Sequence, residues 1–155
     1  MTELSTVAAE CDEAVRVARA RLVHAVRQAS REGMSQREIA RQIHRSQPEV
    51  SRILRFHGTT PLAKRLIHAR GAIMEVVREA GGSGVRVFGS VATGRDTQGS
   101  DVDLLFDMRQ PLGLIRLGEL ERRIAEAVGA DVDLVPIQSL RPDLRHRILG
   151  EAIPL

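Results

Sequence analysis

The sequence Asp-Val-Asp-Leu occurs twice in the second half of the chain, at residues 101–104 and 131–134. Successive side chains of a β-strand point to opposite faces, so each copy would place two carboxylates on one face and two aliphatic side chains on the other. A half-buried strand has this alternation, and apolar residues follow each copy. We therefore expect strands over residues 101–106 and 131–135, each with an acidic face and an apolar face.

Helical patterns lie around these strands. Apolar residues recur at helical spacing over residues 62–80, 114–128 and 142–152. Glycines follow the first two of these segments, as is typical of helix C-termini. A further short strand is expected at residues 85–88. This order of helices and strands predicts an α+β domain over residues 62–155.

The first half of the chain has the pattern of helices alone. Residues 4–31 carry apolar side chains about every 3.6 residues, which predicts one long helix ended by Gly33. Two short helices are expected next, over residues 35–43 and 46–56. Each opens with a serine followed three residues later by a glutamate, which is the signature of a capping box.

The two short helices have the composition of a helix-turn-helix. Ala40 is small at the point where the helices would cross, and their apolar faces would meet. Gln and Arg side chains of the second helix would reach base edges in a major groove, while Arg residues nearby would hold phosphates. The expected DNA-binding residues are Arg37, Arg45, Gln47, Ser51, Arg52 and Arg55.

Residues 30–56 resemble the helix-turn-helix of bacterial repressors and sigma-like regulators. The resemblance implies an all-α DNA-binding domain over residues 1–58, and the turn-prone segment 57–61 would form its boundary. His44 stands where a glycine commonly makes the turn, so it must accept a less favourable backbone conformation. Such repressors bind two half-sites as dimers, and we expect a homodimer with the long first helix as its interface. The alternative is a helical hairpin for protein contact.

Positive charge is concentrated where DNA would bind. The net charge of the 155 residues is +3, whereas residues 15–55 alone carry +7 and residues 61–155 are neutral. A strongly basic segment of this kind is typical of a nucleic-acid-binding element. Three Phe are the only aromatic residues, which argues against a base-stacking platform for single-stranded nucleic acid.

A Gly-Ser pair precedes the first acidic strand. Gly89 would let the backbone approach a phosphate, and Ser90 would open a helical turn whose N–H groups and hydroxyl favour an anion. Asp101 and Asp103 supply hard oxygen ligands of the kind that Mg²⁺ prefers. Asp133, on the third strand, would complete a triad as a metal ligand and general base.

The segment 88–106 resembles the minimal nucleotidyltransferases of the polymerase-beta superfamily. Their pattern is Gly-Ser, a spacer of about ten residues, Asp-x-Asp and a later single Asp on a strand, and the similarity covers about residues 65–155. It implies a small polymerase-beta-like domain with a short mixed sheet flanked by helices. It also implies two Mg²⁺ ions and a nucleoside triphosphate substrate. The implied site consists of the catalytic and metal-binding residues Asp101, Asp103 and Asp133 and the nucleotide-binding residues Gly89, Ser90, Arg95 and Ser100.

One position departs from the family pattern. Many such domains have an arginine where this chain has Thr93, and that arginine is expected to touch phosphate. Arg95 is the candidate substitute. Two alternatives stay open here: the domain binds a nucleotide without catalysis, or Asp101 and Asp103 are ordinary surface carboxylates.

Three functions follow from these alternatives. Minimal nucleotidyltransferases that resemble this one often occur in bacterial toxin–antitoxin pairs. The first function is therefore an antitoxin that transfers a nucleoside monophosphate to a protein or RNA acceptor, binds a partner toxin, and represses its own operator through the helix-turn-helix. The second is a DNA-binding regulator whose inactive second domain senses nucleotide or docks a partner. The third is a toxin that adds nucleotides to tRNA.

Composition also points to a cellular compartment. Cys11 is the only cysteine, which excludes a disulfide within the chain and fits a reducing environment. No run of about 18 apolar residues suggests a membrane span. The acidic, polar N-terminus does not have the pattern of a signal peptide. We expect a cytoplasmic protein with no membrane partner.

Overall fold

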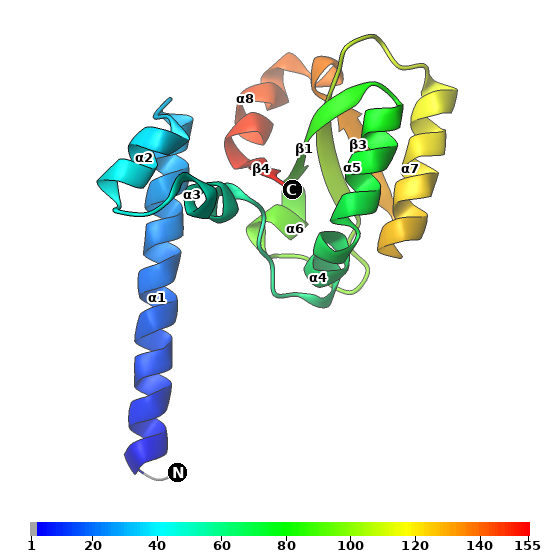
Figure 1. Cartoon of the computed structure of the whole chain (residues 1–155). Coiled ribbons are helices and arrows are strands. Elements are labelled where there is room, and N and C mark those ends of the chain that lie inside the picture. The colour runs from blue at the N-terminus through cyan, green and yellow to red at the C-terminus, as the bar shows by residue number, and fades with distance from the viewer. Residues whose placement is uncertain (1–2) are drawn as a thin grey trace. The chain divides into compact units, whose positions relative to one another are not determined.

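The computed structural model describes residues 3–155 and divides into two compact units, Met1–Leu54 and Arg55–Leu155 (Figure 1). Each unit is described by itself. Phe56 belongs to the second unit because its ring is buried in that unit's core and its backbone N–H donates to the carbonyl of Pro154 at 2.6 Å. The division therefore falls just before the turn-prone segment 57–61.

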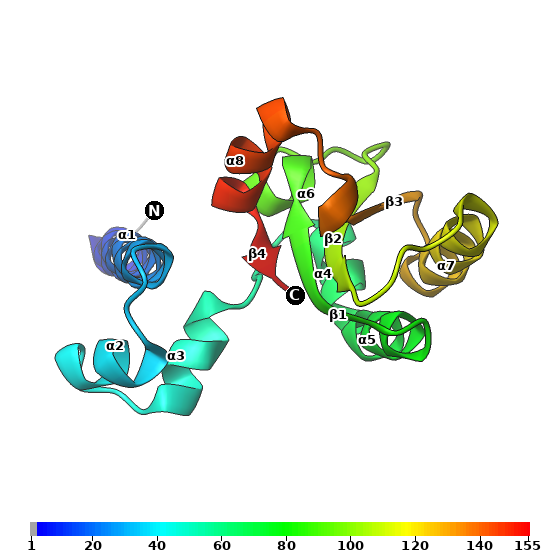
Figure 2. The same cartoon turned by 90° about the horizontal axis from the view of Figure 1, so that it is seen from above.

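Three helices form the described part of the first unit, namely α1 (Glu3–Arg31), α2 (Gln36–Gln42) and α3 (Gln47–Leu54). The two short helices pack against each other and against the C-terminal turns of α1 (Figures 1 and 2). As expected, apolar residues of all three helices meet in one small core. Its buried members are Val26, Ile39, Ala40, Val50 and Leu54.

Local signals fix the ends of the two short helices. The hydroxyl of Ser35 accepts the N–H of Glu38 at 3.2 Å, and that of Ser46 accepts the N–H of Glu49 at 3.4 Å. The Glu49 carboxylate in turn accepts the N–H of Ser46 at 2.8 Å, which completes a capping box. His44 has φ +53°, so the predicted unfavourable turn conformation is confirmed.

A four-stranded mixed sheet organises the second unit. Its strand order is β3-β2-β1-β4; β1 pairs antiparallel with both β2 and β4, whereas β2 and β3 are parallel. The elements in chain order are α4 (Pro61–His68), α5 (Arg70–Glu79), β1 (Gly82–Phe88), α6 (Gly89–Thr93), β2 (Val102–Met108), α7 (Leu114–Val128), β3 (Val132–Pro136), the 3₁₀ helix η1 (Ile137–Ser139), α8 (Pro142–Glu151) and β4 (Ile153–Pro154).

Helices cover both faces of this sheet. On one face, α5 and α7 pack against the strands and enclose the larger core, which includes Leu104 and Phe106 (Figure 2). On the other face, Leu105 packs with Ile137 of η1 and Ile148 of α8 in a smaller cluster. Alternate residues of β2 thus serve different cores, as the period of two requires.

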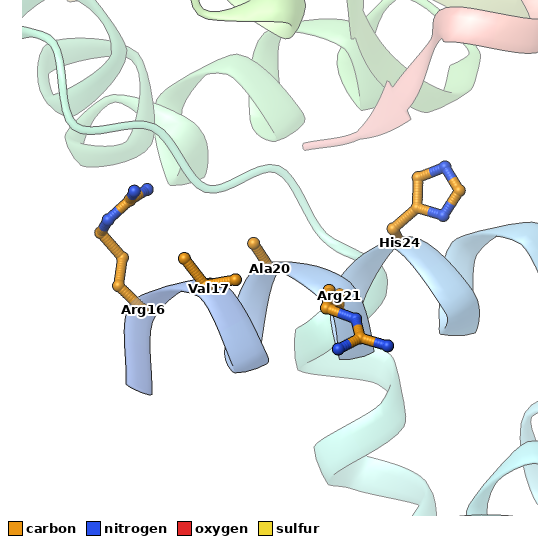
Figure 3. A pocket seen from close by; sticks show the side chains of 5 residues that line it. All are labelled: Arg16, Val17, Ala20, Arg21 and His24. Carbon is orange, nitrogen blue, oxygen red and sulfur yellow. The ribbon is translucent and has the colours of Figure 1, made fainter. Parts of the chain in front are cut away.

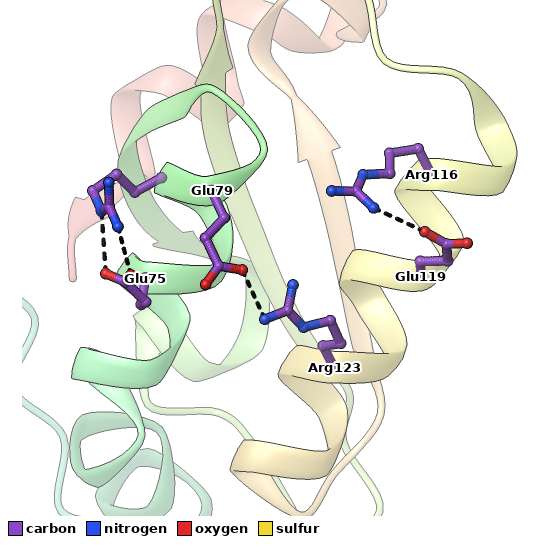
Figure 4. Close-up of polar contacts among 6 residues, drawn as sticks. Glu75, Glu79, Arg116, Glu119 and Arg123 are labelled. Carbon is purple, nitrogen blue, oxygen red and sulfur yellow. Dashed lines mark hydrogen bonds and ion pairs between the residues drawn. The ribbon is translucent and has the colours of Figure 1, made fainter.

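Exposed ion pairs decorate the outer helices. Arg123 of α7 donates to Glu79 of α5 at 2.8 Å and joins the two helices, while Arg116 and Glu119 pair within α7 at 3.1 Å (Figure 4). Pairs this exposed contribute little to stability, so the buried aliphatic core holds α5 and α7 in place.

The predicted α+β class and the mixed sheet flanked by helices are confirmed. The single helix expected over residues 62–80 is wrong, because the helix breaks at Ala69 into α4 and α5. The apolar spacing continues through the break, so Ala69 is buried on the same side as its neighbours. β1 also begins earlier, at Gly82.

Among residues 3–155, no helix combines the length and the apolar character needed to cross a bilayer.

Candidate functional site

Three strand ends meet at one edge of the sheet. Phe88, the last residue of β1, lies opposite Asp103 of β2, and Asp103 lies opposite Asp133 of β3. Paired residues on neighbouring strands point to the same face and lie about 5 Å apart. The second aspartate of each Asp-Val-Asp-Leu sequence is therefore brought beside the other, on the face that carries Leu105.

The turn after β1 passes directly over Asp103. Gly89 has φ +71°, and a Cβ atom at this position would collide with the carboxylate of Asp103. Glycine is required here both for the left-handed backbone and for the close approach. The short helix α6 begins at this glycine and is ended by Gly94, which has φ +72°.

Glu151 is a fourth carboxylate of this site that the sequence analysis missed. It is the last residue of α8, it is partly buried, and its Oε1 accepts the backbone N–H of Gly89 at 3.4 Å. No local pattern around Glu151 marks it, because its importance comes from the packing of α8 against α6.

Negative charge is concentrated around Asp103. Burial is the main reason that the pKa of the Asp103 carboxyl is raised, and neighbouring carboxylates raise it further. These neighbours are, in order of effect, Asp133, Asp101 and Glu151. A partly buried group of like charges is costly, and a bound cation would relieve the repulsion.

Residues 71–155 match the sequence profile of the family described as "Nucleotidyltransferase domain". The chain belongs to this family. A candidate protein adenylyltransferase of Methanocaldococcus jannaschii is 31% identical over 81 residues, which are 52% of this chain and 87% of that protein. Protein adenylyltransferase MntA of Thermococcus cleftensis is 36% identical over 77 residues, which are 50% of this chain and 73% of that protein.

A solved structure shares the fold of the second unit. It is described as a minimal nucleotidyltransferase and matches with a TM-score of 0.55 and 35% sequence identity. The match covers 64% of this chain and all of the other chain. The predicted resemblance is thus confirmed for the second half of the chain, and the protein is a nucleotidyltransferase.

The remaining acidic residues of the nucleotidyltransferase domain differ in position. Asp101 is exposed and stands one residue before β2, and its charge is one of those that raise the pKa of Asp103. Asp131 precedes β3, and its carbonyl accepts the N–H of Val102 at 2.9 Å. Of the two aspartates in the second repeat, Asp133 is the one in register with Asp103.

The expected nucleotide-binding residues fall into two groups. Gly89 and Ser90 lie at the start of α6, beside the carboxylates. Arg95 and Ser100 lie in the loop that follows: the N–H of Arg95 donates to the carbonyl of Ser90 at 2.9 Å, and the Ser100 hydroxyl accepts the N–H of Thr97 at 2.8 Å. These contacts make Ser100 a residue that shapes the loop.

The carboxylates of the site are ligands of the type that bind a magnesium ion. Asp101, Asp103 and Asp133 supply the hard oxygen donors that Mg²⁺ prefers, and their mutual repulsion gives a cation a reason to bind. Within residues 3–155, no three His, Cys, Asp or Glu side chains are already arranged as a complete metal site. Mg²⁺ usually keeps several waters and substrate oxygens among its ligands, so few protein ligands are needed.

The predicted DNA-binding residues lie mostly on α2 and α3. Arg37, Arg45, Gln47 and Arg52 are exposed, and Ser51 is partly buried. Gln47 donates to Gln36 of α2 at 2.5 Å, and Arg45 lies 3.9 Å from Glu49. The helix expected over residues 46–56 ends earlier, at Leu54, so Arg55 lies one residue beyond α3 and is exposed; its role in DNA binding stays a prediction.

Proposed function

We propose that the protein is a Mg²⁺-dependent nucleotidyltransferase that moves AMP from ATP to a hydroxyl of another protein. One observation carries the proposal, namely the glycine turn at Gly89 stacked on Asp103, which itself is in register with Asp133. Relatives named as protein adenylyltransferases support ATP as the donor and a protein as the acceptor.

The chain's own groups suit an in-line displacement at the α-phosphorus. The hydroxyl of Ser90 would donate to a phosphate oxygen, and so would the N–H of Gly89 in place of its long 3.4 Å hydrogen bond to Glu151. Asp133 would accept the proton of the attacking hydroxyl. The bond from that oxygen to the α-phosphorus forms as the bond to the leaving oxygen breaks, and pyrophosphate departs. Magnesium held by the three aspartates would supply charge neutralisation.

The first unit would bind an operator sequence in DNA. The proposal rests on side chains of α2, α3 and the residues beside them, most of which are exposed. Arg37 and Arg45 would bind phosphates, and Gln47, Ser51, Arg52 and Arg55 would face the bases. Two copies of the chain would present two recognition helices to two half-sites. The acceptor would be a partner toxin, and the chain would act as an antitoxin that represses its own operon in the cytoplasm.

Incubation with ATP labelled on the α-phosphate tests the enzymatic proposal. Asp133→Asn is expected to abolish label transfer, because Asp133 is in register with Asp103. Asp131→Asn is the matched control from the same repeat, and it is expected to keep transfer. Label on tRNA in place of protein would favour the toxin reading. Absence of any transfer that depends on Asp133, with nucleotide binding retained, would leave only the inactive regulator.

A further inference from the structure

Most of α1 is not covered by the other helices of the first unit. The helix has 29 residues and is about 43 Å long at 1.5 Å per residue. Residues 3–21 are all exposed, and only the last turns contact α2 and α3 (Figure 1). A helix without tertiary contacts over so much of its length is marginally stable in water, so its free portion needs a partner.

An apolar stripe runs along this free portion and ends at Leu22, which is partly buried against the core of the first unit. Its residues follow one another at alternating spacings of four and three, which is the seam pattern of a coiled coil. The same stripe continues into the core of the first unit, where Val26 is buried and Ala29 partly buried. Leu4 and Val15, on the uncovered part, are 80% and 67% exposed. The stripe consists of Leu4, Ala8, Cys11, Val15, Ala18 and Leu22.

Charge is polarised along the same helix. Residues 3–13 contain four acidic and no basic residues, whereas residues 14–31 contain five arginines and no acidic residue. Two parallel copies would place like charges side by side. Two antiparallel copies would place the acidic segment of each beside the basic segment of the other, and opposite charges at such flanking positions set partner and orientation.

We propose that α1 pairs with α1 of a second copy of this chain as an antiparallel coiled coil. In the register that fits the stripe best, Leu4 lies beside Leu22 of the second copy and Ala8 lies beside Ala18 of the second copy. Residue 13 is the midpoint of this pairing. This pairing would form the homodimer that the proposed function requires. It rests on the proposed function only in that two copies of a DNA-binding unit would bind two half-sites.

The opposite side of α1 stays open in this arrangement. A shallow hollow there is lined by Arg16, Val17, Ala20, Arg21 and His24 (Figure 3). These residues are turned away from the stripe, because 100° per residue places Val17 across the helix from Val15 and Leu22. The basic residues of the hollow therefore remain accessible when the stripe is covered.

Two valines provide a matched test of the stripe. Val15 and Val17 are both exposed in α1, at 67% and 44%, and lie two residues apart on different sides. Light scattering of the full chain should give a dimer, Val15→Gln should raise the dimer dissociation constant at least about tenfold, and Val17→Gln should leave it unchanged. A wild-type monomer at micromolar concentration, or equal effects of the two variants, would overturn the pairing.

Spin labels determine the orientation. A Cys11→Ala chain labelled at Ser5→Cys should give a label separation of roughly 25 Å, because each label lies eight residues from the midpoint. A parallel pair would bring the labels to about 10 Å and would overturn the antiparallel proposal. The dimer should also form in Asp133→Asn, where label transfer is expected to be lost. Retained transfer in this variant, with the dimer intact, would count against the enzymatic proposal alone.

Discussion

The two units of the chain differ in how completely they bury their own apolar surface. The second unit has twenty buried residues in its main core and helices on both faces of its sheet, whereas the described part of the first unit has five. In the first unit, the long helix α1 leaves several apolar side chains exposed to solvent. The second unit can therefore hold a catalytic geometry by itself, whereas the proposed dimer would cover the apolar surface that the first unit leaves exposed.

The largest expected effect is a loss of nucleotidyl transfer in the second unit with no change in DNA binding by the first. Asp103→Asn should lower transfer of label at least about a thousandfold, because it removes the central carboxylate of the site. The raised pKa of Asp103 means that its charged form opposes folding at neutral pH, so the melting temperature should stay equal or rise.

DNA affinity is the control for this variant, and it should not change. A large loss of DNA binding in Asp103→Asn would show that the two units do not function separately. Retained transfer would contradict the assignment of the site.

Two glycines of the turn and of α6 allow the effect of backbone strain on stability to be distinguished from the effect of the close approach to Asp103 on transfer. Gly89 and Gly94 have nearly equal positive φ, so the left-handed backbone alone should cost alanine about 1–2 kcal/mol of stability at either position. A Cβ at Gly89 collides with Asp103, whereas nothing lies within 4 Å of a Cβ at Gly94.

Label transfer should therefore fall about a hundredfold or more in Gly89→Ala and stay within a few fold in Gly94→Ala. Thermal melting measures the shared strain. Equal losses of transfer in the two variants would indicate that flexibility of α6, and not the close approach to Asp103, is what the reaction needs.

Sequence alone predicted the parts of the fold that local chemistry decides. The α7 bounds agree with the predicted 114–128, because an apolar period and a terminal glycine mark both ends. The two strands with acidic repeats follow from the alternation of Asp with Val and Leu. In the same way, the serine caps at Ser35 and Ser46 fixed the short helices.

Tertiary contacts decide the parts that sequence could not predict. The break at Ala69 is invisible because the apolar spacing continues through it. β4 has two residues, and it forms because Ile153 meets Val87 of β1, far away in the chain. Glu151 was missed for the same reason, since only the fold brings it to Gly89.

A third prediction concerns the first unit. Arg52→Ala should weaken binding to the operator about tenfold or more, because Arg52 is exposed on α3 where base contacts are proposed. Transfer of label should be unchanged. Arg122→Ala, on the exposed surface of α7, is the control with the same loss of charge. If both variants weakened DNA binding equally, the binding would depend on the net charge of the protein and not on base contacts by Arg52.

The smallest expected effect concerns Glu151, which holds the backbone donor that a phosphate would use. Its carboxylate accepts the N–H of Gly89 at 3.4 Å and adds negative charge beside Asp103. Glu151→Gln keeps the shape of the side chain and removes the charge. Calorimetric titration with a non-hydrolysable ATP analogue and Mg²⁺ should show binding tighter by roughly two- to fivefold, the scale of one partly exposed charge interaction.

Exposed Glu126→Gln on α7 is the control for general charge effects, and it should leave the affinity unchanged. Weaker binding in Glu151→Gln would reverse the interpretation, because it would mean that the carboxylate contributes to holding the metal and the nucleotide together. In that case Glu151, at the end of α8, would be a residue of the active site. It would then help to bind the metal and the nucleotide and would not compete with phosphate for the N–H of Gly89.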